Sequence, residues 1–506
     1  MPLFAPSFLA SWTGGRWTGQ PVQPLHGFTQ DTRQLLPGQV FVALQTGKRD
    51  GHDFLPAASA AGASAALVSR VNPDLDLPQL VVADPLTAFQ AIAREHRRTF
   101  RGAVTGVTGS CGKTSTKNLL ARLLGGDSVV LSTEGNLNNH LGVPLTLTRL
   151  EPGVHETAVI EAGISGPGEM ATLATMIEPD YGVVTLIAPA HTEELGGVDG
   201  VAREKAVLLE SIRPSGLGVF PKQCWDFAPF QDLPQTSIVA VPEGTKISAP
   251  RVLHFGLIST SASSEVVIGR RRFTFRRVSR GMAQNAVLAI ILASEIGVSD
   301  DAIQRGLDGW QPAKWRGEFR QEGDRSLYLD FYNANPASMA DALDNFFALV
   351  PASEPRLLVL GCMEELGPDS PRYHRELGRS LQLRPQDRAY VIGTEAESVR
   401  AGAIASGQPA ECIEVITTLA PVTQHLQGFR GAVFMKGSRR YELEKALPAS
   451  FEKTASTTAG LPSSGAGAAR SSYGYQDTRS PFASPLTWQF PSVAARRSSP
   501  GNNPLS

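Results

Sequence analysis

The stretch Val107–Thr116, VTGSCGKTST, combines residue types that bind phosphate groups. Lys113 can reach the β and γ oxygens of a nucleoside triphosphate, and the Thr114 hydroxyl can ligate magnesium. The general P-loop pattern G-x-x-x-x-G-K-[ST] needs a glycine at position 107, where this chain has valine, although Gly109 lies nearby. An apolar strand precedes the loop and a helix follows it, so its N–H groups would face a bound phosphate. The sequence therefore favours a nucleotide site over Gly109–Ser115; the alternative is a plain glycine turn.

Two other reactive side chains follow apolar runs that predict strands. Glu161 lies in TAVIEAG, residues 157–163, and its carboxylate is a hard oxygen ligand suited to magnesium. Taken alone, a capping or salt-bridged glutamate is the commoner explanation. His191 follows YGVVTLIA, residues 181–188, and a lone histidine after a strand is more often structural than functional. Neither residue indicates a function by itself.

Lys205 is unusual because of its position in a predicted helix. Val201, Lys205, Leu208 and Ile212 follow one another at steps of four, three and four, which places Lys205 on the inward-facing stripe. A buried lysine without a partner is costly, so it needs an ion pair or a modification. The alternative is a side chain that extends past the edge of the stripe into water. Position alone leaves both explanations open.

The elements that must position these residues form three predicted α/β domains in a chain of 506 residues. They are expected at 1–98, 99–313 and 314–450. The central region alternates strand, glycine-rich turn and helix, which is typical of a mainly parallel, doubly wound sheet. Open sheets of this kind bind ligands beyond the carboxyl ends of their strands, so the residues at three central strand ends should meet there.

Two stretches lack the periodicity of helices or strands. Residues 313–325 are polar and charged, which predicts a linker between the second and third domains. Residues 451–506 are rich in Ser, Ala, Pro and Gly, which predicts a disordered tail without a chemical role.

Composition excludes several classes of protein. The net charge is -1, from 47 basic and 48 acidic residues, so no electrostatic signature of nucleic-acid binding stands out. The four cysteines form no C-x-x-C pair, which argues against a disulfide framework or a zinc site. The N-terminus lacks the basic region of a signal peptide, and the best apolar run is interrupted by Glu295. We therefore expect a cytoplasmic protein without membrane insertion.

The loop, Glu161, His191 and Lys205 together resemble the ATP-dependent Mur ligases of peptidoglycan synthesis. The family loop T-G-[ST]-x-G-K-[ST] is shorter than the general P-loop and matches Thr108–Thr114. The resemblance implies ATP and Mg²⁺ as cofactors, a P-loop-type central domain, a Rossmann-like C-terminal domain and a carbamylated Lys205. The implied catalytic residues are Lys113, Glu161, His191 and Lys205. The implied magnesium ligands are Thr114, Glu161, His191 and carbamylated Lys205.

Two further segments narrow the resemblance within the family. EGNLNNHLGVPLTLT, Glu134–Thr148, and DFYNANPASM, Asp330–Met339, are similar to segments of the member that adds D-Ala-D-Ala to UDP-N-acetylmuramoyl-tripeptide through an acyl phosphate. This implies those two compounds as substrates and a monomeric enzyme. The implied nucleotide-binding residues are Thr108, Gly109, Ser110, Cys111, Gly112, Lys113, Thr114, Ser115, Asn285, Arg316, Asp330 and Asn333. The implied substrate-binding residues are Asp31, Thr32, Arg33, Asn138 and Asn139.

The chain departs from the family pattern at four positions. Gly281 and Met282 replace the His and Asn that the family has near the adenine, Leu329 replaces the first of two aspartates, and Cys362 replaces another. Two alternatives follow: a related ligase that adds a different amino acid, or a ligase-like nucleotide-binding protein that has lost catalysis. The joint presence of all four implied catalytic residues argues against the second. The third residue of the tripeptide, diaminopimelate or lysine, stays open.

Overall fold

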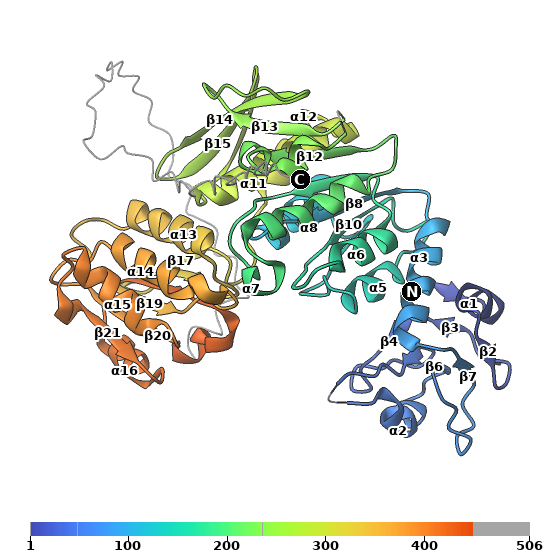
Figure 1. The fold of residues 1–506 in the computed structure, drawn as a ribbon. Coiled ribbons are helices and arrows are strands. Elements are labelled where there is room, and N and C mark those ends of the chain that lie inside the picture. Colours follow the sequence, from blue (N-terminus) through green and yellow to red (C-terminus); the bar gives the residue numbers. More distant parts are fainter. Residues whose placement is uncertain (1, 48, 235, 449–506) are drawn as a thin grey trace, which may run out of the picture. The chain divides into compact units, whose positions relative to one another are not determined.

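The structure is a computed structural model that describes residues 2–47, 49–234 and 236–448 (Figure 1). The stretch 451–506, predicted to be a disordered tail, lies outside the described residues. Three large sheets and one small one organise the described chain, each large sheet flanked by helices. Among the described residues, no helix is both long enough and apolar enough to cross a bilayer.

The N-terminal region forms a five-stranded sheet in the order β2-β7-β6-β5-β4. Strands β4 to β7 are parallel, and the edge strand β2 pairs antiparallel with β7. The strands are β2 Arg16–Trp17, β4 Phe28–Thr29, β5 Val40–Val42, β6 Ala65–Val68 and β7 Gln79–Val81, with β1 Leu3–Phe4 and β3 Leu25–His26 paired separately. The helices are α1 Pro6–Thr13, α2 Leu55–Ala60 and α3 Pro85–Thr99. Asp84 caps α3, because its carboxylate accepts hydrogen bonds from the backbone of Leu86 and Thr87.

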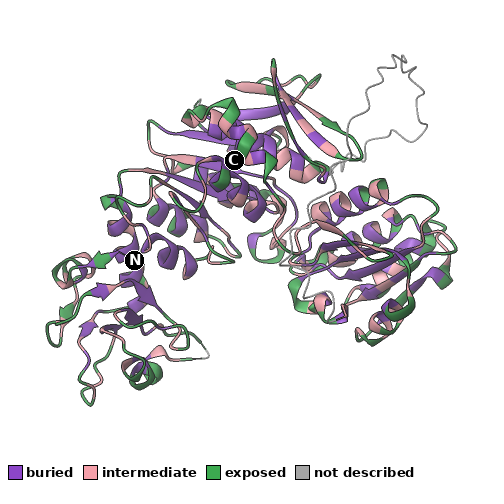
Figure 2. Ribbon diagram, turned by 180° about the vertical axis from the view of Figure 1, so that it is seen from behind, coloured by how far each residue is buried: buried purple, intermediate pink, exposed green. Residues whose placement is uncertain are grey.

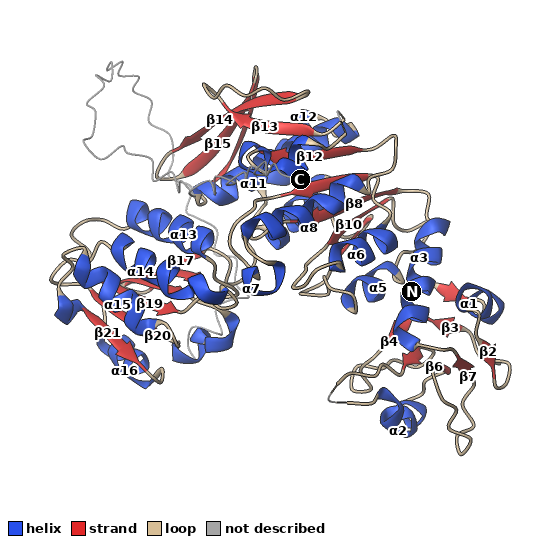
Figure 3. Ribbon diagram, in the orientation of Figure 1, coloured by secondary structure: helices blue, strands red, loops and turns tan. Residues whose placement is uncertain are grey.

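The central sheet has nine strands in the order β16-β15-β14-β13-β12-β11-β8-β10-β9. The strands are β8 Ala103–Thr108, β9 Val130–Ser132, β10 Thr157–Glu161, β11 Tyr181–Val184, β12 Leu217–Pro221, β13 Ile238–Pro242, β14 Val252–Ser259, β15 Ser263–Ile268 and β16 Arg271–Arg276. Strands β8 to β14 pair in parallel, which confirms the predicted doubly wound α/β fold. The sheet continues as an antiparallel meander, β14 to β16, drawn as long red arrows in Figure 3.

Helices cover both faces of the central sheet. Helices α4 Lys113–Leu123, α11 Arg280–Ile296 and α12 Asp300–Asp308 pack together on one face. The other face is covered by α5 Gly142–Leu147, α6 Glu169–Ile177 and α8 Val198–Glu210. Shorter helices follow at α7 Thr192–Leu195, α9 Lys222–Trp225 and α10 Ala228–Gln231. The parallel strands are apolar on both sides and buried, as Figure 2 shows in purple, because helices shield each face from water.

The C-terminal region has a six-stranded sheet in the order β17-β18-β22-β19-β20-β21. The strands are β17 Glu318–Glu322, β18 Arg325–Asp330, β19 Arg356–Gly361, β20 Arg388–Ile392, β21 Ile413–Ile416 and β22 Gly431–Lys436. Only the β17–β18 pairing is antiparallel. The helices are α13 Pro336–Leu349, α14 Ser370–Ser380, α15 Ala396–Ala405 and α16 Ala420–Gly428.

The predicted linker over 313–325 is wrong in its second half, where β17 pairs with β18. Strand β17 can consist largely of charged residues because it lies at the edge of the sheet and its side chains form ion pairs with one another. The Arg320 guanidinium lies 3.1 Å from a Glu318 carboxylate oxygen and 3.4 Å from one of Glu322. Edge strands tolerate such charges, which also discourage pairing with other chains.

Candidate active site

The loop between β8 and α4 needs both of its glycines. Gly109 has a φ of 147° and Gly112 a φ of 79°, a region that favours glycine. A Cβ atom on Gly109 would lie 1.8 Å from the Thr185 hydroxyl oxygen, and one on Gly112 would lie 2.2 Å from the Asn285 amide nitrogen. The loop is therefore a defined turn that needs no glycine at position 107. Its two glycines pack against Thr185, which follows β11, and against Asn285 of α11.

Hydrogen bonds fix the loop at the amino end of α4. The Ser110 hydroxyl donates to the Ala188 carbonyl at 2.8 Å, and the Thr185 hydroxyl donates to the Cys111 carbonyl at 2.5 Å. The Lys113 amino group donates to the Gly109 carbonyl at 2.8 Å, and burial lowers the pKa of Lys113. The backbone N–H groups at the start of α4 and the Lys113 amino group thus lie around the same space. Phosphate groups are commonly bound by N–H groups and a cation placed in this way.

Glu161 is the last residue of β10, the parallel neighbour of β8. The Thr114 hydroxyl donates to one of its carboxylate oxygens at 2.8 Å, and the Asn138 amide donates to the other at 2.7 Å. Thr185 and His191 follow β11, the neighbour of β8 on its other side. The structure therefore brings the three predicted strand ends together around a cavity of about 500 Å³.

The residues around Glu161 fit a magnesium ion only in part. A carboxylate and a threonine hydroxyl are hard oxygen ligands of the kind that Mg²⁺ prefers. In the described ranges of the chain, no three His, Cys, Asp or Glu side chains gather as a complete metal site. An ion at Thr114 and Glu161 would therefore take the rest of its shell from water and phosphate oxygens, as Mg²⁺ commonly does in nucleotide sites.

Lys205 points inward from α8, as predicted, and is only 2% exposed, so the alternative of a solvent-directed side chain is wrong. No residue in the described part of the chain forms an ion pair or hydrogen bond with its amino group. Burial, followed by the positive charge of Lys113, lowers the pKa of Lys205 well below its ordinary value. His191 lies close enough for both lysines to lower its pKa further, although burial is the main cause, and it forms an ion pair with Glu365.

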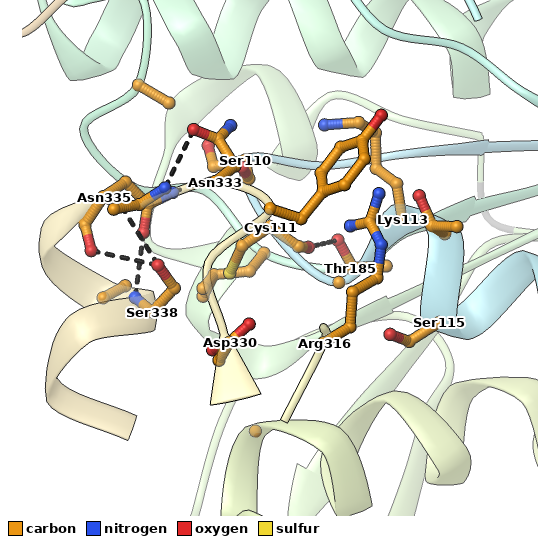
Figure 4. Close-up of a pocket in the computed structure, with 18 of the residues that line it drawn as sticks. Ser110, Cys111, Lys113, Ser115, Thr185, Arg316, Asp330, Asn333, Asn335 and Ser338 are labelled. Atoms are coloured by element: carbon orange, nitrogen blue, oxygen red, sulfur yellow. Dashed lines mark hydrogen bonds between the residues drawn. The ribbon is translucent and has the colours of Figure 1, made fainter. Parts of the chain in front are cut away.

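Residues of the C-terminal region line the same cavity (Figure 4). The Asn335 amide, at the start of α13, donates to the Ser110 carbonyl inside the loop at 3.2 Å. The Arg316 guanidinium stacks over the Tyr332 ring at 3.9 Å. The Lys436 amino group lies 2.7 Å from an Asp330 carboxylate oxygen. Asn285, Arg316, Asp330 and Asn333, predicted to bind the nucleotide, are all among the lining residues.

Four of the predicted substrate-binding residues lie elsewhere among the described residues. Asp31, Thr32 and Arg33 belong to the N-terminal region, where a hydrogen bond from Arg33 lowers the pKa of Asp31 to about 2. The Asn139 side chain accepts hydrogen bonds from the backbone of Leu141 and Gly142 at the start of α5. Their roles stay predictions; of the five residues, only Asn138 lines the cavity.

Comparisons with known proteins agree with this geometry. Residues 107–293 match the Mur ligase middle domain, and residues 315–439 match the Mur ligase, glutamate ligase domain. The UDP-N-acetylmuramoyl-tripeptide–D-alanyl-D-alanine ligase of Escherichia coli K12 is 33% identical over 84% of this chain and 93% of its own length. The chain belongs to the Mur ligase family. It is an ATP-dependent ligase that forms peptide bonds, as the sequence predicts.

A second ligase sequence and a crystal structure are also similar to this Mur ligase over most of its length. The ligase of the same name from Bacillus subtilis 168 is 31% identical over 75% of this chain and 82% of its own length. The crystal structure of MurF from Acinetobacter baumannii matches with a TM-score of 0.78 and 28% identity, over 88% of this chain and 98% of that one. The likeness extends beyond the two matched domains and confirms the three-domain architecture of the family.

Lys117 was not predicted from the sequence as a site residue, although it contacts residues that hold Glu161 in position. It is buried on α4, and its amino group donates to the Thr133 carbonyl at 2.6 Å. The Thr133 hydroxyl in turn accepts a hydrogen bond from the Glu161 backbone N–H at 2.9 Å. Lys117 therefore positions Glu161 through Thr133. Its spacing of four residues from Lys113, on one face of the helix, is the signal that could have revealed it.

Replacing Lys117 by methionine is expected to raise the Mg²⁺ concentration needed for half-maximal activity by about 10-fold, as supporting residues of metal ligands do. The reason is that Thr133 and Glu161 lose the cation that orders them. The measurement is a magnesium titration of phosphate release at saturating ATP. The half-exposed Lys222, replaced in the same way, serves as the control. An unchanged magnesium dependence for Lys117→Met would show that the residue supports stability alone.

Proposed function

We propose that this Mur ligase joins D-Ala-D-Ala to the terminal carboxylate of UDP-N-acetylmuramoyl-tripeptide and converts ATP to ADP and phosphate. The main support is the hydrogen bond from Asn335 to the Ser110 carbonyl. Asn335 belongs to the segment Asp330–Met339, which resembles the D-Ala-D-Ala-adding member, and Ser110 belongs to the nucleotide loop. The two relatives from Escherichia coli and Bacillus subtilis have the name of that activity.

The first step is phosphoryl transfer to the substrate carboxylate. The ATP phosphates lie along the N–H groups of Gly109–Ser115, and Lys113 balances the charge of the β and γ groups. A carboxylate oxygen attacks the γ phosphorus, and the bond from that phosphorus to the bridging oxygen of ADP breaks. Magnesium, held by Thr114 and Glu161 when bound, supplies positive charge against the phosphate oxygens.

The second step forms the peptide bond. The neutral amine of D-Ala-D-Ala attacks the carbonyl carbon of the acyl phosphate, inorganic phosphate leaves, and the amine loses a proton. An acyl phosphate hydrolyses readily, so the site must exclude water during its lifetime. The contact between Asn335 and Ser110 supports this, because it holds the start of α13 against the loop, where a closing movement of the C-terminal region would exclude water.

Carbamylation of Lys205 is part of the proposal. The neutral amine of Lys205 attacks the carbon of CO₂, which forms a nitrogen–carbon bond and releases one proton. A lowered pKa favours the neutral amine that this step needs. The product is an anion beside the Lys113 ammonium, so a costly unpaired amine is replaced by a negative charge that Lys113 attracts. With His191 it would offer a second place for magnesium.

The substrate assignment predicts that phosphate release depends on the dipeptide. Purified protein is incubated with ATP, Mg²⁺ and UDP-N-acetylmuramoyl-tripeptide, together with D-Ala-D-Ala or with single amino acids. We expect release with the dipeptide and less than about 1% of that rate with D-alanine, because buried groups that pair with the second residue would be left unpaired. Tripeptides ending in diaminopimelate and in lysine are compared in parallel.

Two results of this assay would change the assignment. Equal release with a single amino acid would indicate a ligase for another acceptor. No release with any acceptor, while ADP still binds, would indicate a nucleotide-binding protein that has lost catalysis.

A further inference from the structure

The backbone of Ile187, beyond the end of β11, is held by a side chain rather than by a neighbouring strand. The Ile187 N–H donates to the side-chain oxygen of Gln223 at 3.1 Å, and the side-chain nitrogen of Gln223 donates to the Ile187 carbonyl at 2.8 Å. Gln223 lies in α9, directly after β12, and β12 is the parallel neighbour of β11. One amide therefore pairs with both backbone groups of one residue.

The two strands end too early to pair with Ile187 themselves. Their ladder runs only as far as Val183 and Val219, and Pro221, the last residue of β12, has no N–H with which to extend it. Ile187 is 1% exposed, so an unpaired N–H or C=O there would be buried away from water at a cost in free energy. An uncharged amide carries a donor and an acceptor together, as a peptide group does. Gln223 thus takes the place of a further strand residue.

The residues on either side of Ile187 hold the nucleotide loop. The Ser110 N–H donates to the Leu186 carbonyl at 2.8 Å, and the Ala188 N–H donates to the Ser110 hydroxyl oxygen at 2.9 Å. The Ser110 hydroxyl in turn donates to the Ala188 carbonyl at 2.8 Å. Both the backbone N–H and the hydroxyl of Ser110 are therefore bonded to the neighbours of Ile187, so a shift of Ile187 would move the loop.

Gln223 acts on the loop from outside the cavity. Ser110 and Leu186 are among the residues that line the cavity in the described chain, whereas Gln223 is not. The place of Gln223 is fixed from the other side, because the next residue, Cys224, is completely buried in the same core as Phe230. The amide is thus anchored to the core and reaches the loop only through backbone contacts.

We propose that Gln223 is a positioning residue of this ligase, which holds the nucleotide loop in its phosphate-binding shape through the backbone of Ile187. The inference rests on the proposed nucleotide site over Gly109–Ser115. A loop that is held in place before a nucleotide arrives loses little conformational freedom on binding, and this lowers the cost of binding. Without the amide, an N–H and a C=O of Ile187 would be left unpaired, and the segment 185–188 would relax. The bound nucleotide would then have to order the loop itself.

The test measures the equilibrium affinity for ADP by calorimetry. Gln223→Met retains the approximate size of the side chain but pairs with neither backbone group, so we expect it to weaken ADP binding by about 10-fold, within the range of two hydrogen bonds between neutral groups. Gln223→Glu keeps the acceptor and loses the donor, so it should weaken binding by at least about 3-fold even if the methionine variant folds poorly. Gln231→Met is the matched control and should leave the affinity unchanged, because Gln231 also donates to a backbone carbonyl, that of Trp225 at 2.8 Å.

A double-mutant cycle with Ser110→Ala tests the route from Gln223 to the loop. Ser110→Ala removes the hydroxyl that bonds to Ala188 in both directions, so it breaks part of the same route. Two changes along one route should not act independently. We therefore expect the double variant Gln223→Met, Ser110→Ala to bind ADP at least about 3-fold more tightly than the product of the two single losses predicts.

Three outcomes would overturn the inference. A loss in the double variant equal to the product of the single losses would show that Gln223 does not act through Ser110. An ADP affinity of Gln223→Met within about 2-fold of wild type would leave Gln223 as a contact that stabilises the ends of β11 and β12 alone. A wild-type protein that binds no ADP, or a Lys113→Met variant that binds it as tightly as wild type, would overturn the nucleotide site itself and the inference with it. None of these measurements needs an acceptor, so they are independent of the proposed D-Ala-D-Ala specificity.

Discussion

Replacement of Lys113 by methionine is expected to lower kcat by about 10³-fold, within the range attributed to a single cation at the transferring phosphoryl group. Methionine retains the length of the side chain but removes its charge. Lys113 is the first residue of α4, and its amino group lies 2.8 Å from the Gly109 carbonyl, so it reaches the phosphates from inside the loop. Its charge is effective there because the side chain is half-buried and therefore less screened by water than on an open surface.

The measurement is the rate of phosphate release at saturating ATP, tripeptide and dipeptide. Lys246→Met, at an exposed position, is the control for the loss of a lysine. Thermal unfolding of Lys113→Met should stay close to wild type or improve, since a buried amine is removed. If the variant retained more than a tenth of the wild-type rate, Lys113 would not be the cation that balances the γ-phosphate charge.

The location of the site could be predicted from the sequence because its residues follow strands of one parallel sheet. Strands β8, β10 and β11 are neighbours, so the loop at Gly109, the carboxylate of Glu161 and the segment to His191 must meet at one edge. The inward direction of Lys205 followed from helical periodicity for the same kind of reason. In both cases a local pattern determines a long-range position.

Other features of the fold and the site could not be predicted, because no local sequence pattern indicates them. Strand β17 is charged along its length, and its partner β18 supplies the apolar residues that pack in the core. The hydrogen bonds from Lys117 to Thr133 and from Gly281 to Asp341 join residues 16 and 60 positions apart, on different elements. Individual contacts of this kind depend on how helices pack, which hydrophobic periodicity does not determine. At Gly281 the backbone N–H donates a hydrogen bond to the Asp341 carboxylate on α13, a contact that the sequence around Gly281 does not predict.

Replacement of Lys205 by alanine is expected to lower kcat by about 10²-fold, because it removes the proposed carbamate that orients magnesium and the phosphates. The side chain is buried beside Lys113, so the alanine variant leaves a small cavity next to a positive charge. Formate and acetate are small anions that could enter this cavity. They should restore part of the activity of Lys205→Ala, because a carboxylate supplies the same charge as the carbamate.

The rescue separates a carbamate from an ordinary structural lysine. Wild-type protein should not respond to acetate, and Lys205→Arg should be inactive without rescue, since a guanidinium does not form a carbamate and fills the space. Carbamylation needs the neutral amine, so activity of the wild type should fall as pH decreases through the lowered pKa of Lys205, and added bicarbonate should oppose the fall. Full activity in Lys205→Ala, or a loss that no carboxylic acid reverses, would contradict the carbamate. Such a result would leave Lys205 as a buried amine whose cost the fold tolerates for another reason.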